Sequence, residues 1–402
     1  MFYLKVLFYK VIMQVLKLAG KLVPQTQPFI FTGGYSSLAL TKLIIDQDTK
    51  HVFIVTDAVL NKLGITKGVC NLLAEYQVKV TIYDEVTPDP SESVVNNGIA
   101  LLRKQQCDLV LAIGGGSSID AAKMIAVLAH SSQTIKSVAG LLKIRKQGLP
   151  LCVIPTTSGT GSEVTMAAVI TDTENQSKSL VVSPKMMAMA TALDPVLMQG
   201  MPAKITADTG FDALTHAIEA YLSKYANAQT DQFSLTAIKL IFKELPTCYH
   251  RGDDLAARQA LALASCYAGL AFNKTNVGYV HAIAHQIGAK YHSPHGFTNA
   301  VVLPVVLDFY LKGSEKRLAD MAKAIGIDTN NLTSVQAAEQ FILAIKELQA
   351  DVGIPKTLNC IEEKDIKSLA KSALKEAHYF YPVPKYLRPS QCEKMLTQLC
   401  TP

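Results

Sequence analysis

Residues 108–123 read DLVLAIGGGSSIDAAK, an apolar run followed by three glycines and a helix-like pattern. The run 109–113 predicts a buried strand, and consecutive glycines let the backbone turn tightly and approach a ligand with no Cβ in the way. The free N–H groups and the positive end of the following helix would stabilise a bound pyrophosphate. A plain tight turn is the alternative, and the spacing matches neither G-x-G-x-x-G nor the Walker motif. We favour a strand–loop–helix unit that binds phosphate.

Short apolar runs alternate with helix-like segments from about residue 28 to residue 195. The segment 91–105 begins at Ser91 and carries Glu92 in its first turn, as expected for the start of a helix. Strands joined through such helices form β-α-β units, which build a largely parallel sheet covered on both faces. The runs that predict strands are 52–56, 78–83, 109–113, 151–155, 168–171 and 180–183.

Helix periodicity replaces the strand pattern beyond residue 195. It runs through 203–222, 231–245 and 255–271 and recurs at 334–350. A chain of 402 residues exceeds what one hydrophobic core usually organises, so two domains are expected. We predict an α/β, Rossmann-like domain over 1–198, of the kind found in nucleotide-binding folds, and an all-α domain over 199–402.

Composition restricts the class of protein and its compartment. Apolar residues make up 49% of the chain and there is no Trp, which indicates a globular protein with a mainly aliphatic core. The net charge of +6 is spread without a Lys/Arg block, so we expect no nucleic-acid partner. The eight cysteines include no C-x-x-C pair and no tight secreted framework, and this favours a reducing, cytoplasmic location.

The first 25 residues are apolar with regularly placed lysines. Four lysines interrupt the stretch 2–23, namely Lys5, Lys10, Lys17 and Lys21. Together with Gln14, the last three recur at helical spacing and predict an amphipathic helix. We expect this helix to pack on the body of the protein rather than to contact a membrane.

Two further polar features lie near the ends of predicted strands. Asp57 follows the run 52–56, where its carboxylate would accept hydrogen bonds from a ribose or cap a helix over 58–63, and one residue can serve both roles. If Asp57 faces the ribose, a 2′-phosphate within ~4 Å would meet repulsion on the order of 4 kcal/mol, and NAD would be preferred to NADP. The loop 156–163, TTSGTGSE, offers many donors to a ligand or forms a solvated surface loop.

Asp212 and His216 lie four residues apart on the predicted helix 204–222, so their side chains share one face. The apolar residues around them mark this helix as largely buried. A buried carboxylate is costly unless a positive charge compensates it.

The segment 278–296 holds four of the nine histidines within fifteen residues, namely His281, His285, His292 and His295. His281 and His285 repeat the spacing of four on an apolar helix. One carboxylate and three imidazoles suit a borderline divalent metal such as iron or zinc, and a structural hydrogen-bond cluster is the alternative.

Five motifs together resemble the iron-containing (group III) alcohol dehydrogenase family. They are GGGSSID at 114–120, PTTSGTGSE at 155–163, GFDALTHAIE at 210–219, HAIAH at 281–285 and PHG at 294–296. The resemblance covers nearly the whole chain except the first ~25 residues. It implies a dehydroquinate synthase-like fold, with an NAD-binding α/β domain, an all-α metal-binding domain and a homodimer. It also implies iron, with zinc as the other possibility.

The same resemblance implies particular site residues. The metal ligands are Asp212, His216, His281 and His295. His285 matches a family histidine that lies near the metal without binding it, so it is the candidate proton-relay or orienting group, and Phe272 corresponds to a residue of the substrate pocket. The implied NAD contacts are Asp57, Gly115, Gly116, Ser117, Asp120, Thr156, Thr157, Thr160, Lys178 and Leu197.

The expected function is NAD-dependent interconversion of a small primary alcohol or diol with its aldehyde. A polyol dehydrogenase or a sugar-phosphate cyclase on this scaffold would demand anion-binding Lys or Arg near the ligands, and 205–300 holds no such cluster. A non-enzymatic metal or nucleotide sensor is the third alternative. His292 departs from what many family members carry, and we expect it to affect substrate choice if it has a role.

Overall fold

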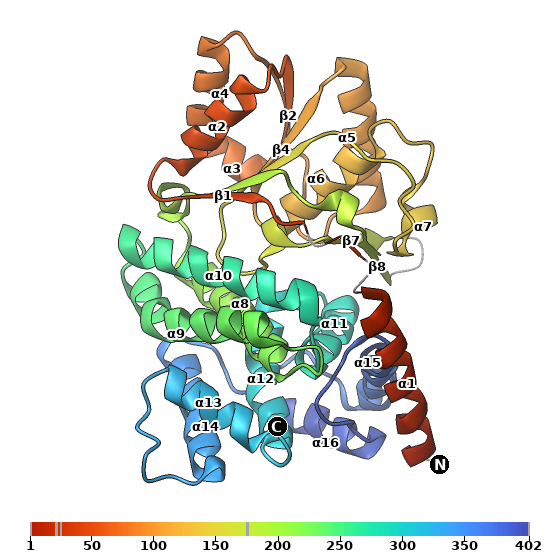
Figure 1. The fold of residues 1–402 in the computed structure, drawn as a ribbon, viewed down its shortest axis with the longest axis vertical. Helices are drawn as coiled ribbons and strands as arrows, with labels where there is room; N and C mark the ends of the chain where they lie inside the picture. Colours follow the sequence, from red (N-terminus) through yellow and green to blue (C-terminus); the bar gives the residue numbers. More distant parts are fainter. Residues whose placement is uncertain (1, 21–22, 25, 174–176, 401–402) are drawn as a thin grey trace. The chain divides into compact units, whose positions relative to one another are not determined.

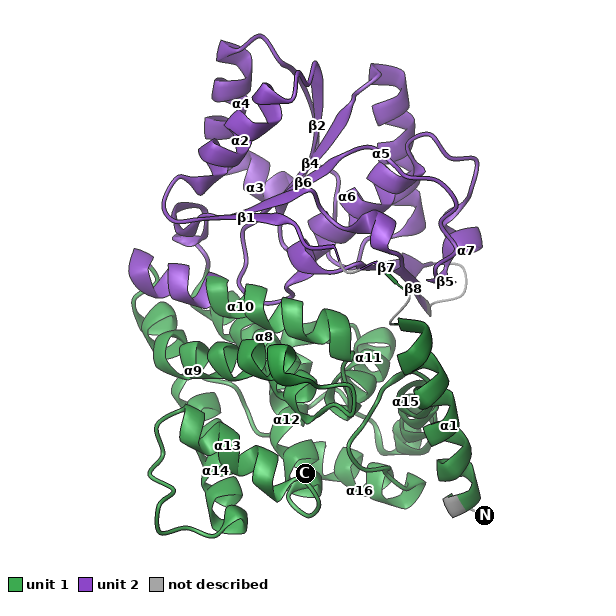
Figure 2. Cartoon of the chain, in the orientation of Figure 1, with its two compact units in different colours: residues 1–23, 202–252, 263–402 green, residues 24–201, 253–262 purple. Residues whose placement is uncertain are grey.

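The computed structural model describes the chain except residues 1, 21–22, 25, 174–176 and 401–402. Its contacts divide the chain into two compact units (Figure 2). One unit comprises residues 1–23, 202–252 and 263–402, and the other comprises 24–201 and 253–262.

The α/β unit is built on a six-stranded sheet in which every pairing is parallel. In spatial order its strands are β1 (Phe29–Thr32), β9 (Ala190–Leu193), β6 (Leu151–Pro155), β4 (Leu109–Gly114), β2 (His51–Val55) and β3 (Lys79–Tyr83). Its longer helices are α2 (Ser36–Asp46), α4 (Lys67–Glu75), α5 (Glu92–Gln105) and α6 (Gly116–Leu128) (Figure 1). Two short helices are α3 (Ala58–Lys62), which precedes α4, and α7 (Ile135–Val138), which follows α6.

Alternation along β2 explains why both faces of this sheet are covered. Phe53 and Val55 join one apolar cluster with residues of α5 and α6, whereas Val52 and Ile54 join a second cluster with residues of α2 and α4. Successive side chains of a strand point to opposite faces, so a run that is apolar throughout needs a helical layer on each side. The predicted fold class of this half is confirmed.

Two of the runs expected in the parallel sheet form a separate sheet instead. β7 (Ala167–Asp172) and β8 (Ser177–Val182) pair antiparallel, and β5 (Gly140–Leu141) adds to the edge of β8. Residues along β7 alternate between buried and half-buried, as is typical of an antiparallel strand with one covered face, whereas β4 and β6 are buried throughout. The parallel sheet gains β1 and β9 instead, two four-residue strands absent from the predicted set.

The second unit is helical, as predicted. Its helices are α1 (Phe2–Gly20), α8 (Ala203–Leu222), α9 (Ala228–His250), most of α10 (Leu255–Thr275), α11 (Tyr279–Tyr291), α12 (His295–Tyr310), α13 (Glu315–Ala324), α14 (Ser334–Asp351), α15 (Ile366–Phe380) and α16 (Pro389–Leu399). Every residue from Gly210 to Leu222 of α8 is buried, and α8 packs against α9 and α12. This central helix carries Asp212 and His216.

The division of the chain differs from the predicted one at two places. α1 belongs to the helical unit, where the Tyr225 hydroxyl donates to the Met13 carbonyl. The start of α10 belongs to the α/β unit, because Arg258 donates to the Met201 carbonyl and Gln259 accepts from the Gly33 N–H. The assignment of α1 and that of the start of α10 both depend on contacts between segments far apart in sequence, which local sequence patterns do not predict.

α10 is also the one helix, among the described residues, whose length and apolar composition would suffice to cross a bilayer. Most of its apolar window, 61%, is buried inside the protein, as in the core helix of a globular domain.

Candidate active site

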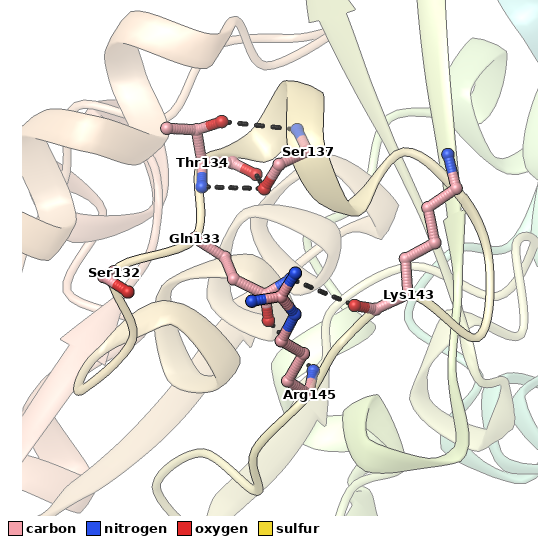
Figure 3. A pocket seen from close by; sticks show the side chains of 6 residues that line it. All are labelled: Ser132, Gln133, Thr134, Ser137, Lys143 and Arg145. Atoms are coloured by element: carbon pink, nitrogen blue, oxygen red, sulfur yellow. Dashed lines mark hydrogen bonds between the residues drawn. The ribbon is translucent and has the colours of Figure 1, made fainter.

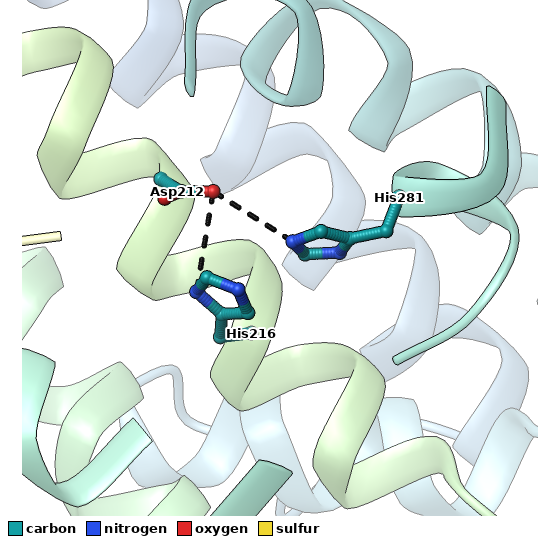
Figure 4. A group of neighbouring side chains, drawn as sticks. All are labelled: Asp212, His216 and His281. Carbon is teal, nitrogen blue, oxygen red and sulfur yellow. Dashed lines mark ion pairs between the residues drawn. The ribbon is translucent and has the colours of Figure 1, made fainter. Parts of the chain in front are cut away.

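Asp212 is buried and lies between His216 and His281, which are also buried (Figure 4), and the half-buried His295 lies close to it as well. Its Oδ1 atom is 3.9 Å from His216 Nδ1, 3.7 Å from His281 Nε2 and 3.5 Å from His295 Nε2. The ligand atoms of Asp212, His216 and His281 all lie within 4.8 Å of one another. These histidine nitrogens are too far from the carboxylate for ordinary hydrogen bonds, yet close enough to share one cation.

Three helices position these four residues. α8 supplies Asp212 and His216 from adjacent turns, α11 supplies His281, and His295 is the first residue of α12. The rings of His216 and His281 stack with centroids 4.4 Å apart. The Phe272 ring also stacks on His216, with a centroid distance of 4.2 Å. Phe272 therefore forms part of the wall around the predicted ligands.

Charge favours an ionised carboxylate at this position. Burial alone would raise the pKa of Asp212, but the nearby imidazoles of His216, His295 and His281 lower it below its usual value. Burial would likewise lower the pKa of His281, whereas its contacts with Asp212 and Glu219 raise it to about 9. The carboxylates of Asp212 and Glu219 therefore favour positive charge at the position of His281.

The residues fit a divalent metal. Asp212 and His281 are only 3% and 2% exposed, and the described residues offer no hydrogen-bond acceptor to His281 Nε2. A cation among these atoms would compensate the buried carboxylate and use the lone pair of that nitrogen. One carboxylate and three imidazoles, without thiolate, match the preference of iron or zinc.

Glu219 is a residue of the site to which sequence reasoning assigned no role. Its carboxylate accepts hydrogen bonds of 2.7 Å from the Gly278 N–H, the Val280 N–H and His281 Nδ1. A Cβ at Gly278 would lie 2.8 Å from Glu219 Oε1, so only glycine permits this approach. The carboxylate fixes the His281 ring so that Nε2 faces Asp212.

Asn299 is a second such residue. Its Nδ2 donates to Asp212 Oδ1 at 2.8 Å and lies 3.1 Å from His295 Nε2. The sequence holds a signal for both residues: Glu219 lies seven positions after Asp212 on one face of α8, and Asn299 lies four after His295 on α12.

His285 lies beside the predicted ligands and is oriented by Glu376. Its ring centroid is 5.3 Å from that of His295 and 5.9 Å from that of His281. Nδ1 donates to Glu376 Oε1 at 2.7 Å, and Glu376 also accepts from Gln286 Nε2 and from the Tyr381 hydroxyl. Glu376 is 91 positions from His285 in sequence, so a local sequence pattern does not predict this pair.

The predicted phosphate loop has the expected backbone arrangement. β4 ends at Gly114, Gly115 is the N-cap of α6, and the helix begins at Gly116 with Ser117 in its first turn. A Cβ at Gly116 would lie 2.6 Å from the Thr160 side chain, so glycine is required where the two loops meet.

The loop 156–163 lies against the glycine loop because β4 and β6 are neighbours in the sheet. Gly114 pairs with Pro155 in register, and the Thr156 N–H donates to the Gly114 carbonyl at 3.0 Å. A Cβ at Gly115 would lie 3.4 Å from the Thr157 side chain. The two loops together form a cradle of backbone N–H groups and hydroxyls that fits a pyrophosphate.

Asp120 and Lys178 have structural partners near this cradle. Asp120 accepts hydrogen bonds from the Ser162 hydroxyl at 2.6 Å and the Val169 N–H at 2.9 Å. Burial raises the pKa of Asp120, and the charge of Lys178 is among those that oppose the rise. The Lys178 ammonium lies 2.7 Å from Asp89 Oδ1.

Asp57 and Leu197 also occupy structural positions. Asp57 accepts from the Leu60 N–H at 2.9 Å and caps α3, so the capping alternative is present in the structure, while the ribose contact stays a prediction. Leu197 lies in the short 3-10 helix η3 (Pro195–Met198) and packs against the apolar cluster on the β2 face that holds Ile54. His292, whose role sequence analysis left open, ends α11 in the left-handed conformation with φ of 55°.

A cavity of about 500 Å³ lies elsewhere in the α/β unit (Figure 3). None of the predicted site residues lines it. Its walls are formed by Ser132, Gln133, Thr134, Ser137, Lys143 and Arg145.

Comparisons with known proteins agree with this geometry. The model of the iron-containing alcohol dehydrogenases matches residues 28–195, and the model of the C-terminal part of the same family matches 206–399. The chain is 40% identical to the 1,3-propanediol dehydrogenase of Klebsiella pneumoniae over 82% of its own length and 87% of that protein. It is 39% identical to the NAD-dependent methanol dehydrogenase of Bacillus methanolicus, covering 81% and 86% of the two chains.

A solved structure of a 1,3-propanediol oxidoreductase superposes with a TM-score of 0.91 at 37% identity, covering 94% of this chain and all of that one. The chain belongs to the iron-containing alcohol dehydrogenase family. This membership confirms the predicted class of enzyme, an NAD-dependent oxidoreductase acting on alcohols.

Proposed function

We propose that this enzyme interconverts a small primary alcohol or diol and its aldehyde, with Asp212, His216, His281 and His295 as the ligands of its metal. The observation that carries this proposal is the convergence of three imidazoles within 4 Å of the Asp212 carboxylate. The substrate class draws support from two similar proteins, one named as a 1,3-propanediol dehydrogenase and the other as a methanol dehydrogenase.

The resident metal we propose is Fe²⁺, with Zn²⁺ as the alternative that the same donors accept. When bound, a divalent cation supplies Lewis-acid chemistry that lowers the pKa of an alcohol hydroxyl. Glu219 accepts a hydrogen bond from His281 Nδ1 and so leaves Nε2 of that ring available to bind the metal.

His285 is the residue we propose to move the proton. Because Nδ1 donates to Glu376, the neutral ring carries its lone pair on Nε2, the atom able to accept a proton. A base that passes protons contributes only when it is held at a defined position, and Glu376 supplies that constraint. Phe272, stacked on His216, forms an apolar wall for the carbon chain of a small substrate.

NAD is proposed to bind the α/β unit, with the glycine loop and the loop 156–163 holding its pyrophosphate. The proposed contacts are Asp57, Gly115, Gly116, Ser117, Asp120, Thr156, Thr157, Thr160, Lys178 and Leu197. Asp120 would also hold the two loops in place, since both of its carboxylate oxygens accept hydrogen bonds within the chain. In this proposal the α/β unit serves the nucleotide and the helical unit serves the metal. The enzyme works as a cytoplasmic homodimer without a nucleic-acid partner.

The test is an anaerobic panel of ethanol, butanol and propanediols on the iron-reconstituted full chain, read by NADH absorbance. We expect turnover with at least one alcohol and the reverse reaction with its aldehyde. His281→Ala should lose both bound metal and turnover, whereas His250→Ala, at an exposed position of α9, should retain both. An active metal-free His281→Ala variant would refute the ligand assignment, and a metal-loaded enzyme silent on the whole panel would favour the sensor.

A further inference from the structure

α1 has two apolar faces, and only one of them is covered. On the covered face Met13 is buried and its carbonyl accepts from the Tyr225 hydroxyl. The Tyr9 ring lies 5.0 Å from that of His378 and 5.1 Å from that of Tyr379, both on α15. These contacts fix the helix on the helical unit, beside α15 (Figure 1).

The other face is a continuous exposed apolar stripe. Six large side chains of α1 have exposed fractions from 56% to 73%, namely Leu4, Leu7, Phe8, Val11, Val15 and Leu18. Their spacing of three, four and seven residues places them on one strip of the helix about 100° wide. Scattered exposed apolar residues are common, but a continuous strip marks an interaction surface.

Positive charge borders this stripe without compensating negative charge on the same helix. Residues 2–20 contain no Asp or Glu, and they contain Lys5, Lys10 and Lys17, of which the first two are exposed. The Lys17 ammonium lies over the Tyr225 ring and donates to a backbone carbonyl of the body. A helix of this composition favours an anionic surface.

α15 extends the positive surface toward α1. Lys367, Lys371 and Lys375 are exposed and recur every four residues, so they share one face of α15. Tyr379 is the next residue of that row, and its ring contacts Tyr9 of α1. The lysine row of α15 therefore ends next to the helix that carries the apolar stripe.

We propose that α1 seats this enzyme on the surface of a bilayer that contains anionic phospholipid. The stripe enters the boundary between headgroups and acyl chains, and the lysines of α1 and α15 lie near the lipid phosphates. The helix lies on the membrane and does not span it, because three lysines interrupt its nineteen residues. The sequence led us to expect no membrane contact, and the exposed stripe is what changes that expectation.

A second copy of the chain fits the stripe less well. Pairing two α1 helices would bring their flanking lysines together, and α1 offers no acidic side chain to offset this repulsion. Lipid phosphates supply the missing negative charge.

Vesicle flotation of the full chain tests the proposal. We expect binding to vesicles of phosphatidylcholine with phosphatidylglycerol, little binding to phosphatidylcholine alone, and release as salt rises from about 0.1 M to about 1 M, which shortens the Debye length from about 10 Å to about 3 Å. The double variant Leu7→Gln, Val11→Gln should weaken binding by roughly tenfold or more, since each large apolar side chain contributes to insertion.

Controls separate membrane binding from misfolding and from self-association. Val335→Gln with Leu343→Gln changes two similarly exposed residues of α14 and should leave flotation unchanged. Lys371→Ser with Lys375→Ser should weaken binding, whereas Lys239→Ser on α9 should not. Equal binding to neutral and anionic vesicles, unchanged flotation of the α1 variant, or a change of that variant's oligomeric state in sedimentation would each overturn the proposal.

Discussion

The Glu219 carboxylate does two tasks with one group. It accepts from two backbone N–H groups at the start of α11 and holds the Nδ1 atom of His281. The positive end of a helix stabilises such an anion, and the anion in turn fixes the ring that carries a metal-binding nitrogen. The geometry of the metal site therefore depends on a residue that is itself not one of its proposed ligands.

Glu219→Gln is predicted to weaken metal binding by about 10- to 100-fold without unfolding the protein. The amide keeps the shape of the side chain but presents an N–H group to donors that need an acceptor. Metal content after dialysis against a graded chelator series measures the effect. Glu339→Gln on the exposed face of α14 is the matched control, and equal metal retention by the two variants would show that Glu219 does not orient His281.

Glu376 is proposed to affect proton transfer only by orienting His285, through the hydrogen bond that it accepts from Nδ1. Glu376→Gln should lower kcat by roughly tenfold or more while metal content and the KM for NAD stay near the wild-type values, because the amide no longer fixes the histidine tautomer. Stopped-flow NADH formation measures the loss. Matched loss of metal and activity would instead make Glu376 a support of the metal site.

At the level of helices and strands, α6 connects the cofactor loops to the core. Lys123 on this helix is fully buried, and its ammonium donates to the Ser162 hydroxyl at 2.8 Å, to the Thr165 hydroxyl at 3.0 Å and to the Ala167 carbonyl at 2.7 Å. These bonds hold the end of the loop 156–163 and the residues after it against α6, the helix that begins at the glycines. The shape of the cradle formed by the glycine loop and the loop 156–163 therefore depends on the hydrogen bonds of Lys123 as well as on the glycines.

Lys123→Met should cost roughly 2 to 4 kcal/mol in unfolding free energy, because it leaves buried hydroxyl and carbonyl groups without their donor. It should also raise the Kd for NADH, since the loop 156–163 loses its support. Urea unfolding and NADH fluorescence measure the two effects. Lys239→Met on an exposed turn of α9 should change neither, and a Lys123 variant with native stability would contradict the bracing role.

Across the whole chain, the sequence predicted what local patterns encode. The strand–glycine–helix unit, the change to helices after residue 195, and the Asp212 and His216 pair all depend on spacings of a few residues. β7 and β8 were misassigned because an apolar run does not show which strand it will pair with. The alternation along β7 is one of burial in the structure, and its sequence, AAVITD, does not alternate between apolar and polar residues. Glu376 and the lysine row beside α1 depend on contacts between distant segments, which no short pattern records.

The stability of the chain should depend on pH through His378. This histidine is buried, its Nε2 accepts from the Tyr279 hydroxyl at 2.8 Å, and that hydroxyl accepts from the Leu387 N–H. Burial lowers the pKa of His378 to about 4, below the ordinary histidine value of 6.5 that applies to the unfolded chain. Between pH 6.5 and pH 4 this histidine is protonated in the unfolded chain and neutral in the folded protein. The free energy of unfolding therefore decreases as the pH falls through this range.

We therefore predict that His378 removes up to about 3 kcal/mol of unfolding free energy as the pH falls from 6.5 to 4. Glu163 and Asp208, whose pKa values burial raises to about 7 and about 6, act in the opposite direction, so the wild-type slope alone is not diagnostic. The difference between wild type and His378→Gln isolates the histidine, because glutamine still accepts from Tyr279 and does not titrate. Urea unfolding at several pH values should give a variant that loses less stability in acid than the wild type, with His250→Gln as control. Parallel curves for wild type and His378→Gln would mean that His378 carries a proton in the folded protein as readily as in the unfolded chain.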